Sequence, residues 1–134
     1  MTEESMIEGG CACGAVRFAA RGAPLRVGLC HCLTCRKAHA AAFNPFVVFA
    51  LDQVEITGTL KAWSSTPGHE RRFCPECGSR VAMRMTDGNE IELSIGSFDA
   101  VGIVDPQYES WVVRREPWQH ALPVPQNLHD RLGA

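Results

Sequence analysis

The sequence predicts a mostly β protein, in which small antiparallel sheets are tied together by metal ions and accompanied by one short helix. Three observations lead to this prediction. Turn residues recur at short intervals, the segments between them alternate apolar and polar residues as half-buried strands do, and the chain of 134 residues contains seven cysteines. A chain of this length, without an internal repeat or a linker, is expected to form a single domain over residues 1–134.

The composition is typical of a globular protein and excludes several other classes. Hydrophobic residues make up 46% of the chain and charged residues 21%, which excludes disordered, collagenous and coiled-coil proteins. The formal net charge of −2 favours neither nucleic acid nor a membrane surface as a partner. The acidic start lacks the apolar run of a secretory signal, and no window approaches the roughly 18 apolar residues of a membrane span. We therefore expect a cytoplasmic protein.

Periodicity locates the expected elements. Strand patterns occupy residues 16–19, 46–49, 54–56, 91–95 and 111–113. A single short helix is expected after the second cysteine cluster, over about residues 33–42, with Thr34 as a candidate N-cap. The tail from Pro123 onward is rich in proline and polar residues and is expected to be loosely held.

The cysteines lie in three tight clusters, which indicates metal binding rather than disulfides. Thiols stay reduced in the cytoplasm, and a closed disulfide framework would leave one of seven unpaired. Glycines follow Cys13 and Cys77, and a turn that wraps backbone amides around a thiolate often needs a positive φ at such a position. These two glycine-terminated pairs are therefore expected to form one closed, structural zinc site. Its ligands are Cys11, Cys13, Cys74 and Cys77. The arginines expected to balance its negative charge are Arg71, Arg72 and Arg80.

The remaining cysteines, Cys30, Cys32 and Cys35, predict a second zinc site of a different kind. Three protein ligands with one open coordination position are typical of catalytic zinc. The open position can hold water or a substrate thiol, whose pKa the metal lowers. Side chains that could close the site instead are His31, His39, His69 or a carboxylate.

Charged and titratable side chains follow this cluster directly. Arg36 and Lys37 come immediately after Cys35, where they could hold the carboxylates of a substrate or simply offset the charge of the thiolates. His31 and His39 are the nearest groups that could transfer a proton, although a structural role is the more common one for such histidines.

Three motifs closely resemble those of the glutathione-dependent formaldehyde-activating family, which shares its domain with centromere protein V. They are Gly-Gly-Cys-Ala-Cys-Gly-Ala-Val-Arg-Phe at residues 9–18, Cys-His-Cys-Leu-Thr-Cys-Arg-Lys at 30–37, and Arg-Phe-Cys-Pro-Glu-Cys-Gly-Ser at 72–79. The likeness continues through Gly-Ser-Phe-Asp at 96–99 and Pro-Trp at 117–118.

The resemblance implies a tent-like fold of small β-sheets similar to that of Mss4. It also implies the same division of the cysteines between a structural zinc and a second zinc. The enzyme that names the family joins glutathione and formaldehyde into S-hydroxymethylglutathione, so the implied activity is that of a carbon–sulfur lyase and the implied partner is a small thiol such as glutathione. Two alternatives are a non-catalytic zinc scaffold that binds proteins and thiol–disulfide exchange at one of the Cys-x-x-Cys pairs.

Overall fold

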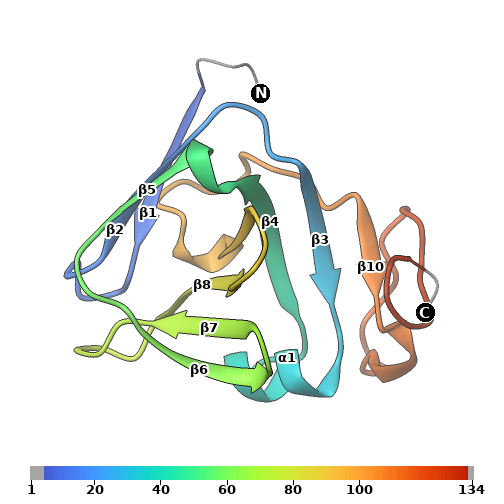
Figure 1. The fold of residues 1–134 in the computed structure, drawn as a ribbon. Helices are drawn as coiled ribbons and strands as arrows, with labels where there is room; N and C mark the ends of the chain where they lie inside the picture. Colours follow the sequence, from blue (N-terminus) through green and yellow to red (C-terminus); the bar gives the residue numbers. More distant parts are fainter. Residues whose placement is uncertain (1–4, 133–134) are drawn as a thin grey trace.

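The described part of the chain, residues 5–132, is mostly β with one short α-helix, as the sequence predicts (Figure 1). The structure is a computed structural model. Its strands are β1 (Met6–Gly10), β2 (Arg17–Arg21), β3 (Arg26–Cys30), β4 (Asn44–Ala50), β5 (Val54–Thr57), β6 (Lys61–Thr66), β7 (His69–Phe73), β8 (Arg80–Met85), β9 (Glu90–Ser94) and β10 (Tyr108–Ser110). The helix is α1 (Leu33–His39), and short 3-10 turns lie at Leu51–Gln53, Ile95–Ser97 and Val112–Arg114.

The strands form two sheets. In Figure 1 the smaller sheet lies on the left, whereas the larger runs from β10 on the right through β4 to β7 and β6 at the lower left. The smaller sheet has the order β1-β2-β5, and the larger has the order β10-β3-β4-β9-β8-β7-β6. Neighbouring strands are antiparallel except for β10, which pairs parallel with β3 at the edge of the larger sheet. The expected arrangement of small, mainly antiparallel sheets is confirmed.

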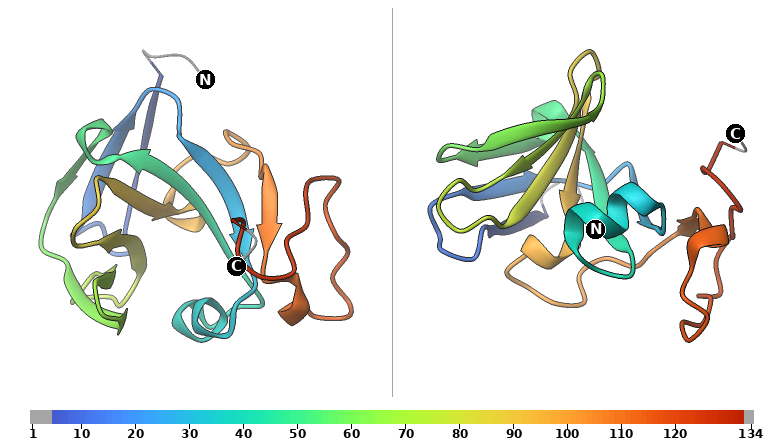
Figure 2. Two further views of the ribbon diagram at one scale, coloured as in Figure 1. Left: turned by 45° about the vertical axis from the view of Figure 1, so that its right-hand side comes forward. Right: turned by 90° about the horizontal axis from the view of Figure 1, so that it is seen from below.

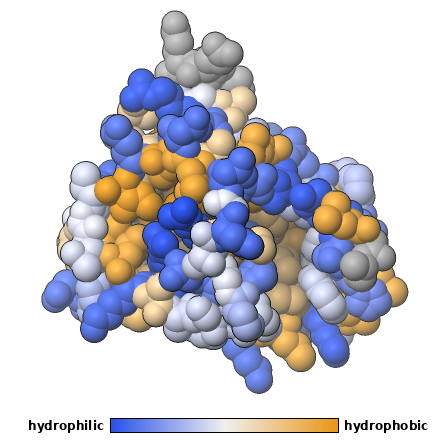
Figure 3. Space-filling model, viewed as in Figure 1, coloured by the Kyte–Doolittle hydropathy of each residue, from blue (hydrophilic) through white to orange (hydrophobic). Residues whose placement is uncertain are grey.

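The apolar core fills the space between the two sheets. Alternate residues of β4 and β9 point into it, among them Val47, Phe49 and Leu93, each with 0% exposed area. Cys11 and Cys74 belong to the same buried cluster, so one group of cysteines lies at the edge of the core. On the face seen in Figure 3, apolar side chains gather toward the left, and hydrophilic side chains border them.

Helix α1 is shorter than expected and begins differently. It covers Leu33–His39, and its N-cap is Cys32 rather than Thr34, because the Cys32 Sγ accepts a hydrogen bond from the backbone N–H of Cys35 at 3.2 Å. Ala40 ends the helix in the left-handed conformation, with φ of 48°. No helix formed by residues 5–132 has the length and apolarity needed to cross a lipid bilayer.

The chain after β10 departs from two expectations. The strand predicted at residues 111–113 is wrong, because Trp111 adopts a left-handed conformation (φ 58°) and begins a 3-10 turn. The backbone turns here because the Trp111 N–H binds the carbonyl of His129 at 2.7 Å. The loosely held tail is also wrong as far as residue 132, since Pro125 and Asn127 each hydrogen-bond the backbone of Glu109. Figure 2 shows this segment looping outside the two sheets and returning beside β10.

Candidate metal centres and the adjoining groove

The first candidate metal centre joins the two sheets through four cysteines. Cys11 and Cys13 lie between β1 and β2, whereas Cys74 and Cys77 lie between β7 and β8. The four sulfur atoms lie within 4.8 Å of one another, and all seven cysteines of the protein are free thiols. The structure brings together the four cysteines that the sequence groups, and the cluster could hold a metal ion.

Backbone and hydroxyl groups are aimed at these sulfurs. The N–H of Val16 donates to Cys11 Sγ at 3.2 Å, and the N–H of Glu76 donates to Cys74 Sγ at 3.4 Å. Donors at such positions stabilise a thiolate rather than a thiol. Ser79 connects the two loops, since its hydroxyl lies 3.1 Å from one sulfur, Cys77 Sγ, and accepts the N–H of Ala12 at 3.0 Å.

The turns depend on the two predicted glycines. Gly14 has φ of 84° and Gly78 has φ of 78°, a region that other residues enter only at a cost. Hydrogen bonds from Ser79 lower the pKa of Cys77 to about 5. This loop therefore presents an ionised sulfur at neutral pH.

The second candidate metal centre contains three cysteines. Cys30 ends β3, Cys32 caps α1 and Cys35 lies in the first turn of the helix. Their sulfur atoms lie within 4.8 Å of one another, and no fourth His, Cys, Asp or Glu ligand atom of residues 5–132 lies within the same distance of all three. This centre could also hold a metal ion, and it offers one ligand fewer than the first.

The charge of the three-cysteine centre shows that it suits a cation. Hydrogen bonds with Cys30 and Cys35 hold the pKa of Cys32 far below its ordinary value, whereas the bond with Cys32 and burial raise the pKa of Cys30. Thiols this close repel one another when all are ionised, so their protons come off one sulfur at a time. A bound cation offsets this repulsion, so that all three sulfurs can be ionised at once.

Polar side chains from the larger sheet support the second centre. Arg71 of β7, only 7% exposed, donates from its guanidinium to Cys35 Sγ at 3.7 Å. Asn44 of β4 places its amide nitrogen 4.0 Å from the same sulfur and 3.4 Å from a carboxylate oxygen of Glu92. The expectation that Arg71 serves the four-cysteine centre is wrong. Arg72 instead pairs with Glu70 at 2.8 Å.

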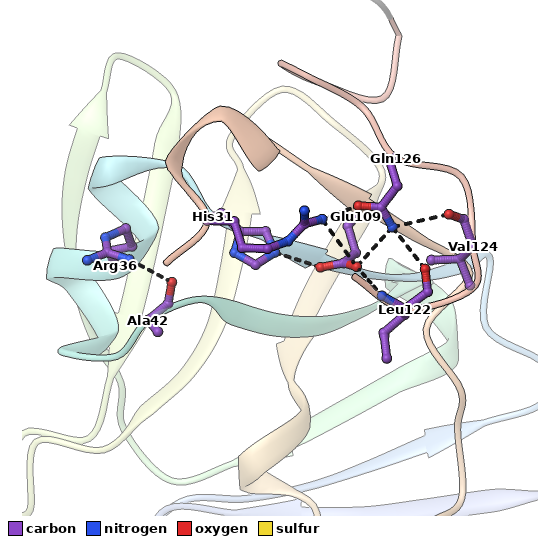
Figure 4. Close-up of polar contacts among 8 residues, drawn as sticks. His31, Arg36, Ala42, Glu109, Leu122, Val124 and Gln126 are labelled. Carbon is purple, nitrogen blue, oxygen red and sulfur yellow. Dashed lines mark hydrogen bonds and ion pairs between the residues drawn. The ribbon is translucent and has the colours of Figure 1, made fainter. Parts of the chain in front are cut away.

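His31 is a structural residue, not a member of the cysteine cluster. Its ring is fully buried, and its Nε2 lies 2.7 Å from Glu109 Oε1, as Figure 4 shows. The other oxygen of Glu109 accepts the N–H of Leu122 at 2.8 Å and the amide of Gln126 at 2.9 Å. Through Glu109, the C-terminal segment is therefore tied to His31, which lies between the candidate ligands Cys30 and Cys32. Nothing in the sequence distinguished Glu109 from an ordinary strand residue.

Arg36 and Lys37 lie on the outer side of α1. The Arg36 guanidinium pairs with Glu116 at 2.6 Å and donates to the Ala42 carbonyl at 3.1 Å, a contact also drawn in Figure 4. Lys37 is exposed, and both residues line a shallow pocket that includes Trp118. Their role in binding a substrate stays a prediction.

An open groove of about 1020 Å³ adjoins the four-cysteine centre through Cys11 and approaches the three-cysteine centre through Asn44, whose Nδ2 lies 4.0 Å from Cys35 Sγ. Its polar and aromatic lining includes Cys11, Ser79, Arg80, Trp63, His39 and Asn44. Burial, followed by the charges of Arg80 and Arg71, lowers the pKa of His39 to about 4, so its imidazole is neutral at pH 7. The groove is large enough for a ligand the size of a short peptide.

These features define a small β protein with two cysteine centres, each able to hold a metal ion. The chain belongs to the glutathione-dependent formaldehyde-activating enzyme family, whose model matches residues 6–114. Both cysteine centres lie inside this match.

Two known proteins show the extent of the likeness. The chain is 30% identical over 81 residues to an uncharacterized lyase of Schizosaccharomyces pombe, a match that covers 60% of this chain and 59% of that protein. The chain thus spans less than two thirds of the length of this curated relative. The crystal structure of a Rhodobacter sphaeroides protein is similar in fold, with a TM-score of 0.58 and 19% identity over 72% of this chain and 91% of that one.

Proposed function

We propose that the protein is a zinc-dependent carbon–sulfur lyase that acts on the adduct of a small thiol, such as glutathione, with an aldehyde. The observation that carries this proposal is the three-cysteine centre, which offers three sulfurs and no fourth ligand atom among the described residues. The family description and the lyase name of the yeast relative support the reaction class.

Zinc suits the donor set of both centres, because thiolate sulfur is a soft ligand that zinc binds readily. We assign a structural zinc to Cys11, Cys13, Cys74 and Cys77 and a second zinc to Cys30, Cys32 and Cys35. At the second centre, zinc would offer a vacant coordination position to an entering thiol. As a Lewis acid, it would lower the pKa of that thiol. Both centres need reduced cysteines, which agrees with a cytoplasmic location.

The reaction forms a bond between the thiol sulfur and the aldehyde carbon while the thiol proton passes to the carbonyl oxygen; the lyase direction reverses these changes. The protein's own residues prepare the site. Arg71 and Asn44 hold Cys35, and the N–H of Cys35 holds Cys32, so the three sulfurs keep one orientation. The buried pair of His31 and Glu109 fixes the loop between Cys30 and Cys32.

The second candidate is a non-catalytic scaffold with two structural zinc ions. Exposed apolar side chains favour it, including Trp118 at 68% and Val101 at 98% exposure, because such side chains occur where proteins bind one another. This candidate requires a fourth ligand on the second zinc.

Metal analysis followed by thiol titration separates these functions. We expect two zinc ions per chain in freshly purified protein. With cobalt replacing zinc, addition of glutathione should shift the visible absorption of the three-cysteine centre, and glutathione should accelerate formaldehyde consumption. Unchanged cobalt spectra and no aldehyde consumption would leave the scaffold as the better account. Fewer than one metal ion per chain would favour thiol–disulfide exchange.

A further inference from the structure

Arg80, at the start of β8, is a partly buried cation that has no carboxylate partner among residues 5–132. Its guanidinium lies over the ring of Trp63, with Cζ 5.6 Å from the ring centroid. The Nε atom is buried and has no hydrogen-bond partner. No carboxylate of residues 5–132 forms a salt bridge with Arg80. A buried donor left in this way is costly unless a ligand satisfies it.

Five of the eleven arginines form salt bridges with carboxylates of residues 5–132, whereas Arg80, which lines the groove, does not. The pairs are Arg17 with Asp99, Arg26 with Glu90, Arg36 with Glu116, Arg72 with Glu70 and Arg115 with Glu109. The guanidinium of Arg80 instead lies over the ring of Trp63. This leaves the edge of the guanidinium able to donate hydrogen bonds. Because Arg lies flat on an aromatic ring and still offers a fork of N–H groups, this arrangement favours a planar anion such as a carboxylate.

The surroundings of Arg80 are positive as well. Arg71 lies near enough that its charge, after burial, contributes to lowering the pKa of Arg80. His39, whose pKa the charges of Arg80 and Arg71 help to lower, is neutral at pH 7. The anionic group that acts on Arg80 is the sulfur of Cys35, whose charge raises the pKa of Arg80. An anionic ligand would relieve the repulsion between the two arginines.

Asn44 joins this region to the three-cysteine centre. The side chain lines the groove and is 1% exposed, with its Oδ1 buried and without a hydrogen-bond partner. Its Nδ2 lies 4.0 Å from Cys35 Sγ. The groove is therefore bordered by the guanidinium of Arg80 and by a buried amide next to Cys35 whose Oδ1 has no partner.

We propose that Arg80 is the anion-binding residue of the groove and holds a carboxylate of the substrate, while the substrate's thiol is directed toward the three-cysteine centre. The position of the substrate's thiol rests on the proposed function, whereas the binding of its carboxylate at Arg80 does not. This placement also relocates substrate binding, because Arg36 already has the carboxylate of Glu116 and lies on the outer side of α1.

Isothermal titration of the zinc-loaded protein tests this inference with three probes. S-methylglutathione keeps the carboxylates without a free thiol, 2-mercaptoethanol has a thiol without a carboxylate, and glutathione has both. We expect Arg80→Gln to weaken S-methylglutathione and glutathione about 10-fold or more, the loss of a charged hydrogen bond, and to leave 2-mercaptoethanol unchanged. Arg72→Gln is the matched control on the same hairpin, and Arg36→Gln tests the outer side of α1. Melting temperature and zinc content establish that each variant is folded.

The outcomes separate the two proposals. Three results would each overturn the role of Arg80. The first is that Arg80→Gln binds S-methylglutathione as tightly as the wild type does, and the second is a larger loss of affinity in Arg36→Gln. The third is that the unmodified protein does not bind S-methylglutathione. If S-methylglutathione binds in an Arg80-dependent manner while thiols leave the cobalt spectrum unchanged, the anion site stands and the proposed lyase activity fails. If thiols perturb the spectrum equally in wild type and Arg80→Gln, the metal chemistry stands and the anion site fails.

Discussion

Replacing Glu109 should destabilise the protein strongly and loosen the three-cysteine centre. Glu109 and His31 are both 0% exposed, and their contact is 2.7 Å long. In Glu109→Ala, the buried imidazole of His31 loses its hydrogen-bond partner. The backbone N–H of Leu122 and the side-chain amide of Gln126 lose their acceptor. Breaking a buried pair from one side typically costs about 3–5 kcal/mol. That is a large part of the roughly 5–15 kcal/mol that holds a domain folded.

The size of the effect can be measured by thermal and urea unfolding of the zinc-loaded protein. For a chain of this length, the loss corresponds to a fall in melting temperature of roughly 10–20 °C. Glu109→Gln keeps an acceptor of the same shape and should cost less, about 1–3 kcal/mol. Because His31 lies between two candidate ligands, a chelator should also remove metal from the three-cysteine centre faster in both variants.

Asp99→Ala provides the control, because it breaks an ion pair with Arg17 whose side chains are 52% and 43% exposed. An exposed pair is worth at most about 1 kcal/mol. If Glu109→Ala melted within a few degrees of the wild type, or no lower than Asp99→Ala, the buried pair would not hold the C-terminal segment to the cysteine loop.

Three further outcomes are expected. Cys74→Ala should unfold or severely destabilise the protein, whereas Cys32→Ala should remain folded with one metal ion; equal disorder of the two by circular dichroism would contradict the division between the centres. Burial raises the pKa of Glu92 to about 7 from its ordinary 4.5, so the folded state binds this proton more tightly and wild-type stability should fall as pH rises through 7. Glu92→Gln should therefore match the wild type near pH 4 and exceed it by up to about 3 kcal/mol at pH 8 in urea unfolding. Arg71→Gln should release metal to a chelator about 10-fold faster from the three-cysteine centre, with the four-cysteine centre unchanged.

The cysteine centres were predictable because their geometry is largely local. Two cysteines separated by one or two residues turn their sulfurs toward one point wherever the segment lies, and Gly14 and Gly78 mark the turns that allow it. The strand at 91–95 was predictable because alternation reports which face of a strand is buried, and the strand at 46–49 because a short apolar run indicates a buried strand.

The errors lie where distant segments meet. Residues 111–113 have a strand composition, yet the carbonyl of His129 draws the backbone of Trp111 into a turn. The proline-rich tail is held because Glu109 offers it an acceptor in the interior. Neither contact leaves a mark in the local sequence.

The sequence by itself determined the three cysteine motifs, the mostly β architecture and the family, because these depend on short spacings and on patterns along single segments. Only the tertiary structure decided which arginine serves which centre. Arg71 and Arg72 are neighbours in β7, but adjacent side chains of a strand point to opposite faces, so one reaches Cys35 and the other pairs with Glu70. The contact of Arg80 with Trp63 likewise joins β8 to β6 across β7, and the local sequence does not indicate it.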